Sequence, residues 1–289
     1  NISASSRGNV LALSGDRQNV QAGKTVLESL YADLKKGGEV GPAQVDAAIR
    51  MVTNQSAETK NISTGGDAFI KTMKKNIKPY SPMQAKYMQM LQENDLVFAM
   101  GPAGTGKTYI AVAMAVSQFI GGNVEKIILS RPAVEAGEKL GFLPGDLKEK
   151  VDPYLRPLYD ALLDMIPAEK LARHMENGEI EVAPLAFMRG RTFSNSFVIL
   201  DEAQNTTPTQ MKMFLTRMGE KSRMVVTGDL SQTDLPKDVK SGLGDAVRKL
   251  QAIEGIGMVH FSDSDVVRHE LAARIIKAYD EWDRKKKNG

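Results

Sequence analysis

The stretch LVFAMGPAGTGKT, residues 96–108, joins a short apolar run to a glycine-rich loop with the spacing GxxxxGK[ST]. Glycines let consecutive backbone N–H groups turn inward around an anion, and the helix that follows directs its N-terminus at the same charge. In such a loop Lys107 reaches the β- and γ-phosphates of ATP and thereby serves catalysis, and Thr108 offers its hydroxyl oxygen to Mg²⁺. The alternative is a structural glycine turn without a ligand. The residues predicted to bind the nucleotide are Gly101, Pro102, Ala103, Gly104, Thr105, Gly106, Lys107, Thr108 and Tyr109.

A second apolar run, 197–200, ends in the acidic pair Asp201 and Glu202. Ligands of open α/β sheets bind outside the carboxyl ends of the strands, so both carboxylates are expected beside the glycine-rich loop. Asp201 is predicted to hold Mg²⁺ through water, and Glu202 to be the catalytic group that polarises the attacking water. The alternative is an acidic N-cap for the next helix, although Thr207 and Pro208 already provide that cap.

Two amides complete the predicted site. The apolar run 224–227 leads into GDLSQ, residues 228–232, where Gln232 is predicted to contact the γ-phosphate and report its loss; a plain turn is the alternative. Gln84 lies one turn into a helix that precedes the first strand, and its amide can hydrogen-bond adenine. The alternative for Gln84 is an ordinary surface glutamine.

The order of apolar runs and helical stretches predicts an α/β fold with a mostly parallel sheet covered on both faces. Further apolar runs lie at 126–130, 180–183 and 258–261, and the charged, helical stretch 131–178 is an insertion relative to a minimal strand–helix–strand unit. A small α/β domain is predicted over residues 1–60, with a strand at 9–13 and helices at 20–36 and 42–52. Residues 61–78 are predicted to be a basic linker, and residues 79–289 the nucleotide-binding domain.

Composition limits the classes of protein and of site. The chain has 289 residues, no cysteine and three scattered histidines, which excludes disulfides and thiolate metal sites. No apolar run approaches the roughly 18 residues of a membrane span, so we expect no membrane and a reducing cytoplasm. The net charge of +3 favours anionic partners, and basic runs occur at 71–78 and 284–287; the alternative for each run is a solvated surface.

Taken together, the motifs resemble those of the PhoH family of ATPases. They are SPMQ at 81–84, GPAGTGKT at 101–108, SRPAVEAGEKLGFLPGDLKEKVDPY at 130–154, ILDEAQN at 199–205 and TGDLSQTDLP at 227–236. The resemblance covers nearly all of residues 79–280, and the first 78 more weakly, where the chain looks like the PhoH-like (PhoL) subgroup. It implies a RecA-like core related to superfamily 1 helicases, ATP hydrolysis, association with RNA and a hexameric ring. It also implies association with an endoribonuclease that matures ribosomal RNA.

Full helicases of that superfamily close two RecA-like domains around the nucleotide, whereas this chain has one. A single core lacks the arginine that stabilises transition-state charge from the opposite side, and a neighbouring subunit of a ring can supply it. The first candidate for this catalytic arginine is Arg268, after the last strand, followed by Arg274 and Arg131. The alternative for Arg268 is a surface arginine of a helix.

Arg189 and Arg191, in FMRGRTF at 187–193, are the candidates for contact with single-stranded RNA. Guanidinium groups beside aromatic rings suit a phosphate backbone and stacked bases. The alternative is a basic loop whose phenylalanines are turned into the core. Three functions therefore stay open: an RNA-linked ATPase such as a helicase or remodelling motor, an ATP-dependent switch or scaffold for a partner nuclease, and a P-loop kinase for a small metabolite.

Overall fold

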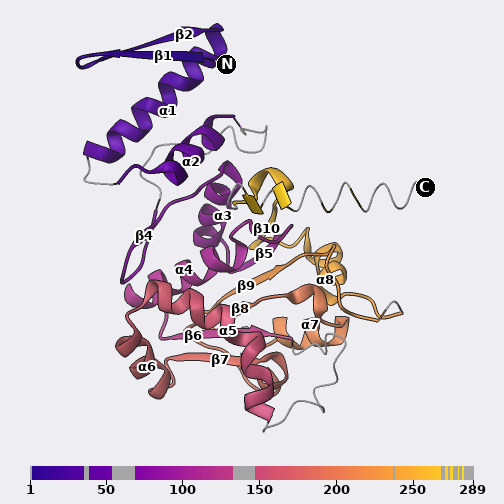
Figure 1. The fold of residues 1–289 in the computed structure, drawn as a ribbon. Coiled ribbons are helices and arrows are strands. Elements are labelled where there is room, and N and C mark those ends of the chain that lie inside the picture. The colour runs from indigo at the N-terminus through magenta and orange to yellow at the C-terminus, as the bar shows by residue number, and fades with distance from the viewer. Residues whose placement is uncertain are drawn as a thin grey trace.

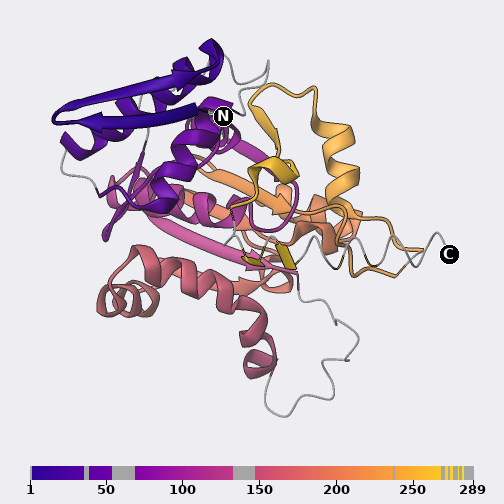
Figure 2. The same cartoon turned by 45° about the horizontal axis from the view of Figure 1, so that its top comes forward.

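The computed structural model describes residues 2–35, 39–53, 69–132, 147–236 and 238–267, and beyond them residues 271, 272, 274, 275, 279 and 282. Several predicted features lie outside these residues, among them Arg268, the basic tail 284–287 and most of the polar stretch 53–67. Figures 1 and 2 show a central sheet flanked by helices, with the N-terminal elements at one end of the molecule.

The six strands of the central sheet are all parallel and have the order β10-β5-β9-β8-β6-β7. Their bounds are β5 (Leu96–Met100), β6 (Lys126–Arg131), β7 (Ile180–Pro184), β8 (Ser196–Leu200), β9 (Arg223–Gly228) and β10 (Ile256–His260). Every residue of β5 and of β8 is buried, as is typical of parallel strands with helices on both faces. Strand β9 separates the glycine-rich-loop strand β5 from the acidic strand β8, so the loop and the acidic pair follow strands that lie two positions apart in the sheet. The predicted fold class is confirmed.

Helices cover both faces of this sheet (Figure 1). One face carries α3 (Pro82–Glu93), α4 (Lys107–Ile120), α5 (Leu147–Met165) and α6 (Ala168–Glu176), and the other carries α7 (Pro208–Leu215) and α8 (Gly242–Leu250). Side chains of a strand alternate between the two layers, so Phe197 and Ile199 pack on the α4 side while Val198 and Leu200 pack on the α7 side. Residues 110–116 of α4 are all buried, and this anchors the glycine-rich loop to the core.

Capping residues determine where the helices near the loop begin. The Ser81 hydroxyl accepts a hydrogen bond from the Gln84 N–H, 3.2 Å away, at the start of α3. Thr207 caps α7 in a capping box with Gln210. Glu202 precedes the short 3-10 helix Ala203–Asn205, but its side chain makes no capping hydrogen bond there, so neither carboxylate of the acidic pair caps a helix.

The N-terminal region consists of a hairpin and two helices. β1 (Ile2–Arg7) and β2 (Val10–Gly15) pair in antiparallel register, whereas the sequence pattern predicts only the second strand. The serine-rich first strand has only one large apolar residue, Ile2, so its pattern gives a weak strand signal. Helices α1 (Arg17–Lys35) and α2 (Pro42–Thr53) confirm the predicted helices, with ends that differ by a few residues.

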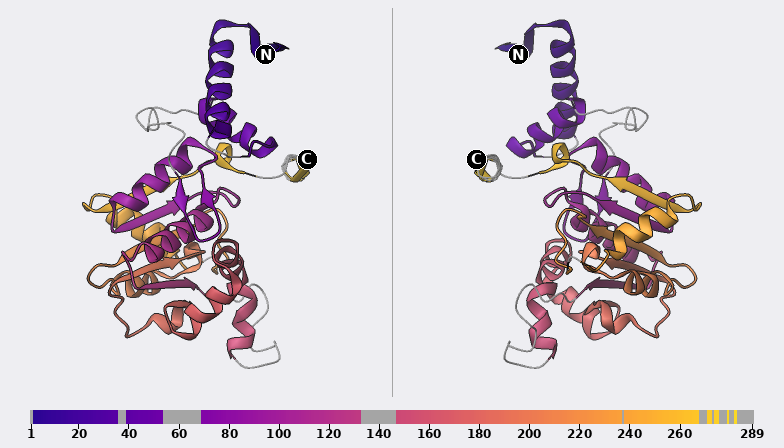
Figure 3. Two further views of the ribbon diagram at one scale, coloured as in Figure 1. Left: turned by 90° about the vertical axis from the view of Figure 1, so that its left-hand side faces the viewer. Right: turned by 90° about the vertical axis from the view of Figure 1, so that its right-hand side faces the viewer.

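This N-terminal region has a core of its own, in which Val26, Leu30 and Ala47 are buried. It contacts the larger domain through an ion pair between Lys78 and Asp33, 2.7 Å, and through a 3.4 Å hydrogen bond from Arg50 to the Val266 carbonyl. Figure 3 shows these elements standing at one end of the larger domain.

Residues 70–77 differ from the predicted linker. β3 (Ile70–Lys71) and β4 (Asn76–Ile77) form a short antiparallel hairpin, and both isoleucines are buried in the same cluster as α4. The backbone N–H of Lys74 donates to the Met165 carbonyl of α5, 3.1 Å away. Strands of two residues carry no periodicity, so the basic side chains dominate the sequence pattern. The hairpin is an edge of the nucleotide-binding domain.

Of the insertion predicted over 131–178, Arg131 is the last residue of β6, and the rest of the described part is mainly helical, in α5 and α6. Leu158, Leu162 and Met165 of α5 are completely buried, so this helix is part of the core. Residues 133–146, within the same insertion, lie outside the described residues. Across the described part of the chain, every helix is too short or too polar to cross a lipid bilayer.

Candidate functional site

The carboxyl ends of β5, β9 and β8 meet at one edge of the sheet, beside a cavity of about 250 Å³. This volume is below the roughly 300–1,000 Å³ of pockets that enclose a whole ligand, so it suits the phosphate end of a nucleotide. The predicted residues at its wall are Ala103, Gly104, Gly106, Lys107, Thr108, Tyr109, Asp201, Glu202 and Gln232. The structure thus brings the phosphate loop, the acidic pair and the expected γ-phosphate amide together.

The phosphate loop needs its glycines at two kinds of position. Gly101 has φ of 139°, and a Cβ there would lie 2.4 Å from the Phe261 carbonyl oxygen, so backbone packing excludes a side chain. Gly104 and Gly106 have φ of 84° and 80°, in the left-handed region that favours glycine. The loop is tied to the neighbouring strand by a 3.1 Å bond from the Gly101 N–H to the Gly228 carbonyl. It is therefore preformed, as an anion cradle must be.

Lys107 lies folded into the loop. Its ammonium group donates to the carbonyls of Gly101 and Pro102, 2.6 and 2.7 Å away, and to the Thr105 hydroxyl at 3.3 Å. Burial lowers the pKa of Lys107, and the nearby carboxylates of Asp229, Asp201 and Glu202 oppose that shift. The loop carbonyls thus hold the ammonium group at the cavity wall, where it can exchange one of its bonds for a phosphate oxygen.

Asp201 is almost completely buried and receives hydrogen bonds at both oxygens. Oδ1 accepts from the hydroxyls of Thr108, at 2.6 Å, and Thr227, and Oδ2 accepts from the guanidinium of Arg131, with Nε 2.8 Å away. Mg²⁺ in nucleotide sites binds one or two protein oxygens and completes its shell with phosphates and water. No cluster of three acidic, histidine or cysteine side chains that could cage a metal occurs among the described residues. The Thr108–Asp201 pair fits a magnesium ion that binds together with a nucleotide.

Glu202 is held in a left-handed backbone conformation, with φ of 54° and ψ of 37°. This conformation is uncommon for a residue with a side chain and is concentrated at functional sites. Its carboxylate is 46% exposed and accepts a 2.6 Å hydrogen bond from the Gln204 amide. The turn therefore aims a partly solvated carboxylate at the cavity, beside a buried one.

Gln204 is a residue that sequence reasoning missed. It is 1% exposed, and its amide bonds three residues: Nε2 donates to Glu202 and to the Gln232 carbonyl, 3.2 Å away, while Oε1 accepts from the Asp229 N–H at 3.0 Å. Its side chain thereby couples the turn after β8 to the loop after β9. The one signal in the sequence is an amide two residues after the carboxylate that is predicted to be catalytic, Glu202.

Asp229 is a second missed residue. Its Oδ1 accepts from the Ser231 N–H and hydroxyl, while Oδ2 is buried without a hydrogen-bond partner. An unpaired buried carboxylate oxygen at the cavity wall is costly, and water or a ligand can satisfy it. Gln232, three residues on, is exposed and lines the cavity, so its side chain is positioned for the predicted contact with a γ-phosphate.

Gln84 and Tyr109 are already engaged by the protein. The Gln84 amide donates to the Thr105 carbonyl at 3.0 Å and accepts from the Tyr80 N–H at 2.7 Å, so it supports the phosphate loop; contact with adenine requires these bonds to exchange. Tyr109 lines the cavity, and its hydroxyl donates to Asp164 of α5, 2.6 Å away. Lys75 also pairs with Asp164, and both bonds lower the pKa of that carboxyl.

The candidate arginines are in different environments. Arg131 is paired with Asp201 of its own chain, a position that does not support a role in a neighbouring subunit's site. Arg274 is exposed. Arg189 is exposed beside Phe187, which is 55% exposed. Arg191 instead forms two bonds with Glu181, at 2.7 and 2.6 Å, and this carboxylate raises its pKa.

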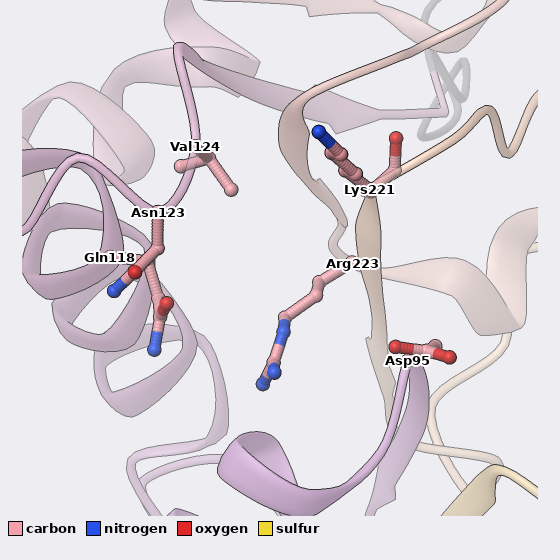
Figure 4. A pocket seen from close by; sticks show the side chains of 7 residues that line it. Asp95, Gln118, Asn123, Val124, Lys221 and Arg223 are labelled. Carbon is pink, nitrogen blue, oxygen red and sulfur yellow. The ribbon is translucent and has the colours of Figure 1, made fainter.

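A larger cavity, of about 480 Å³, lies at the opposite edge of the sheet, where strands begin (Figure 4). Arg223 extends into it, but its NH1 group donates to the carbonyls of Leu91 and Gln92, 2.9 and 2.8 Å away, at the end of α3. Arg223 thus satisfies helix-end carbonyls. Because ligands of open α/β sheets bind at the carboxyl ends of the strands, the smaller cavity is the candidate site.

Comparison with known proteins decides the family. The sequence model of the family described as PhoH-like protein matches residues 76–280. The chain belongs to the PhoH-like family. It is 53% identical over 280 residues to a PhoH-like protein of Bacillus subtilis, covering 97% of this chain and 88% of the relative.

A second PhoH-like relative, from Mycobacterium leprae, is 47% identical over 277 residues. The alignment covers 96% of this chain and 79% of the relative. The solved UvsW helicase of Bacteriophage T4 aligns over 82% of this chain and 77% of its own, at 12% identity and a TM-score of 0.40, which is a distant likeness. Family and site geometry together identify a P-loop ATPase core of the PhoH-like family.

Replacing Lys107 with alanine tests the phosphate loop. The variant loses the ammonium group at the cavity wall, so we expect ATP turnover to fall by about 10²–10³, as when one charge-stabilising donor is removed from an active site. Steady-state phosphate release measures this loss. Lys170→Ala, an exposed lysine of α6, is the matched control and should keep the parent rate. A parent rate in Lys107→Ala contradicts the assignment.

Proposed function

We propose that this PhoH-like protein is a magnesium-dependent ATP hydrolase that acts on or with RNA, as an RNA helicase or remodelling motor in RNA processing. The observation that carries hydrolysis is the pair of unlike carboxylates after β8: Asp201 is 3% exposed and Glu202 is 46% exposed. The buried carboxylate is bonded to the phosphate-loop Thr108, and the solvated one is available to a water molecule. A kinase for a small metabolite has less use for that second carboxylate.

Each residue has one task in the proposed reaction. Lys107 binds phosphate oxygens, and Thr108 and Asp201 hold the magnesium ion, which when bound neutralises charge on the phosphates. Glu202 accepts the proton of the attacking water, and Gln204 fixes the orientation of its carboxylate through the 2.6 Å hydrogen bond. Gln232 contacts the γ-phosphate and transmits its loss to the loop after β9.

The exposed pair Phe187 and Arg189 supports the link to RNA. They follow β7, at the same edge of the sheet as the nucleotide cavity, and offer an aromatic face and a cation to solvent. Stacking on an aromatic ring and contact with phosphate are the two modes by which single strands are bound without sequence preference. Phe193 is buried and Arg191 is paired with Glu181, so the RNA contact centres on the first half of the loop.

Binding of single-stranded RNA should accelerate ATP hydrolysis and should weaken steeply with salt. The double change Phe187→Ala and Arg189→Ala should cost about 1–3 kcal/mol of RNA affinity, the value of one stacked base. Neutralising Lys285 to Lys287 is the control and should cost less. Fluorescence anisotropy and phosphate release, with RNA and with DNA, measure both quantities. An equal loss of RNA affinity in the tail variant would indicate that the RNA-binding surface lies away from the ATPase domain.

We further propose a hexameric ring in which each nucleotide lies between neighbours. A partner subunit beside the cavity can supply an arginine, with Arg268 the first candidate and Arg274 the second. Leu271, Ile275, Tyr279 and Trp282 are all at least 49% exposed and recur every three or four residues, which gives an apolar stripe suited to subunit contact.

Mixing two inactive variants tests this arrangement. Lys107→Ala subunits combined with Arg268→Ala subunits should regain part of the ATPase rate, because some interfaces then hold an intact loop and an intact arginine. An arginine supplied in trans is worth about 10³–10⁵ in rate. Native mass spectrometry of the same samples should show closed rings. A monomer that turns over ATP at the full rate contradicts the proposal.

The second candidate function is an ATP-dependent switch that regulates a partner endoribonuclease without unwinding RNA. The N-terminal region favours it, since Val10, Tyr31 and Leu34 are 69%, 60% and 51% exposed and lie on elements far from the nucleotide cavity. Stimulation of ATPase by RNA separates the two functions, because a switch of this kind need not couple hydrolysis to strand binding.

A further inference from the structure

Arg131, the last residue of β6, places its guanidinium on the buried carboxylate of Asp201. Nε and NH2 both donate to Asp201 Oδ2, with Nε at 2.8 Å, and NH2 lies 3.9 Å from Glu202. The Arg131 side chain is 16% exposed, and that of Asp201 is 3% exposed. A carboxylate so deeply buried needs a cation or several donors, and Arg131 supplies the cation.

The same carboxylate belongs to the proposed magnesium site. Thr108, whose hydroxyl is expected to contact the metal, donates to Asp201 Oδ1, and the planar fork of Arg131 covers Oδ2. A divalent cation beside Asp201 is repelled by a guanidinium bonded to the same group. Asp201 therefore has two competing cationic partners, one of which is part of the protein.

Arg131 also contacts the insertion. Its NH1 group donates to the Tyr154 carbonyl of α5, 3.0 Å away, so one guanidinium joins the end of β6, the acidic residue after β8 and the helix of the insertion. The bond to Tyr154 and the bonds to Asp201 come from one planar group, so rotation of the guanidinium away from the carboxylate breaks both. Displacement of the Arg131 guanidinium from Asp201 therefore also removes a contact with α5.

We propose that Arg131 is a latch that neutralises Asp201 when no metal nucleotide is bound and that leaves it when the metal binds, releasing its hold on α5. This inference rests on the proposed magnesium nucleotide site. It makes Arg131 a positioning residue of its own subunit, not an arginine that acts on a neighbour. Metal binding at Asp201 then changes the contacts of the insertion at Tyr154.

The experiment measures Mn²⁺, as a probe for Mg²⁺, bound to the full chain in the presence of ADP by electron paramagnetic resonance. Removing a competing cation should tighten metal binding, so Arg131→Gln is expected to bind Mn²⁺ about tenfold more strongly than the parent. Arg156→Gln changes an exposed arginine of α5 and is the matched control, expected to bind as the parent does. Arg131→Lys keeps the charge without the fork, and should bind more tightly by a smaller factor; it replaces Arg131→Gln if that variant does not fold.

Hydrogen exchange of residues 154–165 gives the second readout. In the parent, exchange should rise when Mg²⁺ is added to the ADP complex, and in Arg131→Gln it should already be high and unresponsive. Equal or weaker Mn²⁺ binding in the Arg131 variants overturns the latch, because Arg131 then only supports Asp201. A parent α5 that ignores the metal overturns it as well. A parent that binds ADP but no Mn²⁺ instead refutes the magnesium site on which the proposal rests.

Discussion

The hydrogen bond between Thr108 and Asp201, 2.6 Å long, is the contact around which the site is built. It joins the first turn of the helix after β5 to the end of β8, two strands that are separated in the sheet by β9. The sheet order makes this contact possible, since β9 also contributes Thr227 to the same carboxylate oxygen. Three segments that are far apart in sequence thus meet at one buried carboxylate, and Lys107, Glu202 and Gln204 take their positions from that junction.

Burial gives the two carboxylates after β8 different chemistry. Asp201 lies at the end of β8, enclosed by the hydroxyls of Thr108 and Thr227 and by the guanidinium of Arg131. Glu202 sits in a left-handed turn at the edge of solvent, where a water molecule can reach it. In the proposed reaction these neighbouring carboxylates divide metal binding and proton transfer between them, and their different environments decide the division.

Much of this architecture follows from local sequence. Continuous apolar runs predict the buried strands at 96–100 and 197–200, and the glycine spacing predicts the phosphate loop, because these signals come from neighbouring residues. The pairing of Arg131 with Asp201 and the bridge from Gln204 to Asp229 could not be predicted, since they join residues whose proximity depends on strand order. Similarly, Arg191 resembles Arg189 in sequence, and only the nearness of Glu181 shows that one is neutralised and the other exposed. The sequence of the hairpin 70–77 predicts a linker, because its two buried isoleucines are too few to form an apolar pattern.

The proposed hydrolysis at this edge of the sheet requires Glu202 as the proton acceptor. The most direct measurement compares ATP affinity and turnover in Glu202→Gln, in which glutamine keeps the shape of the side chain and removes its basicity. If Glu202 is the general base, the variant should bind ATP like the parent and turn it over about 10²–10⁴ times more slowly, the usual contribution of a general base. Turnover at the parent rate, with binding intact, would contradict this role of Glu202.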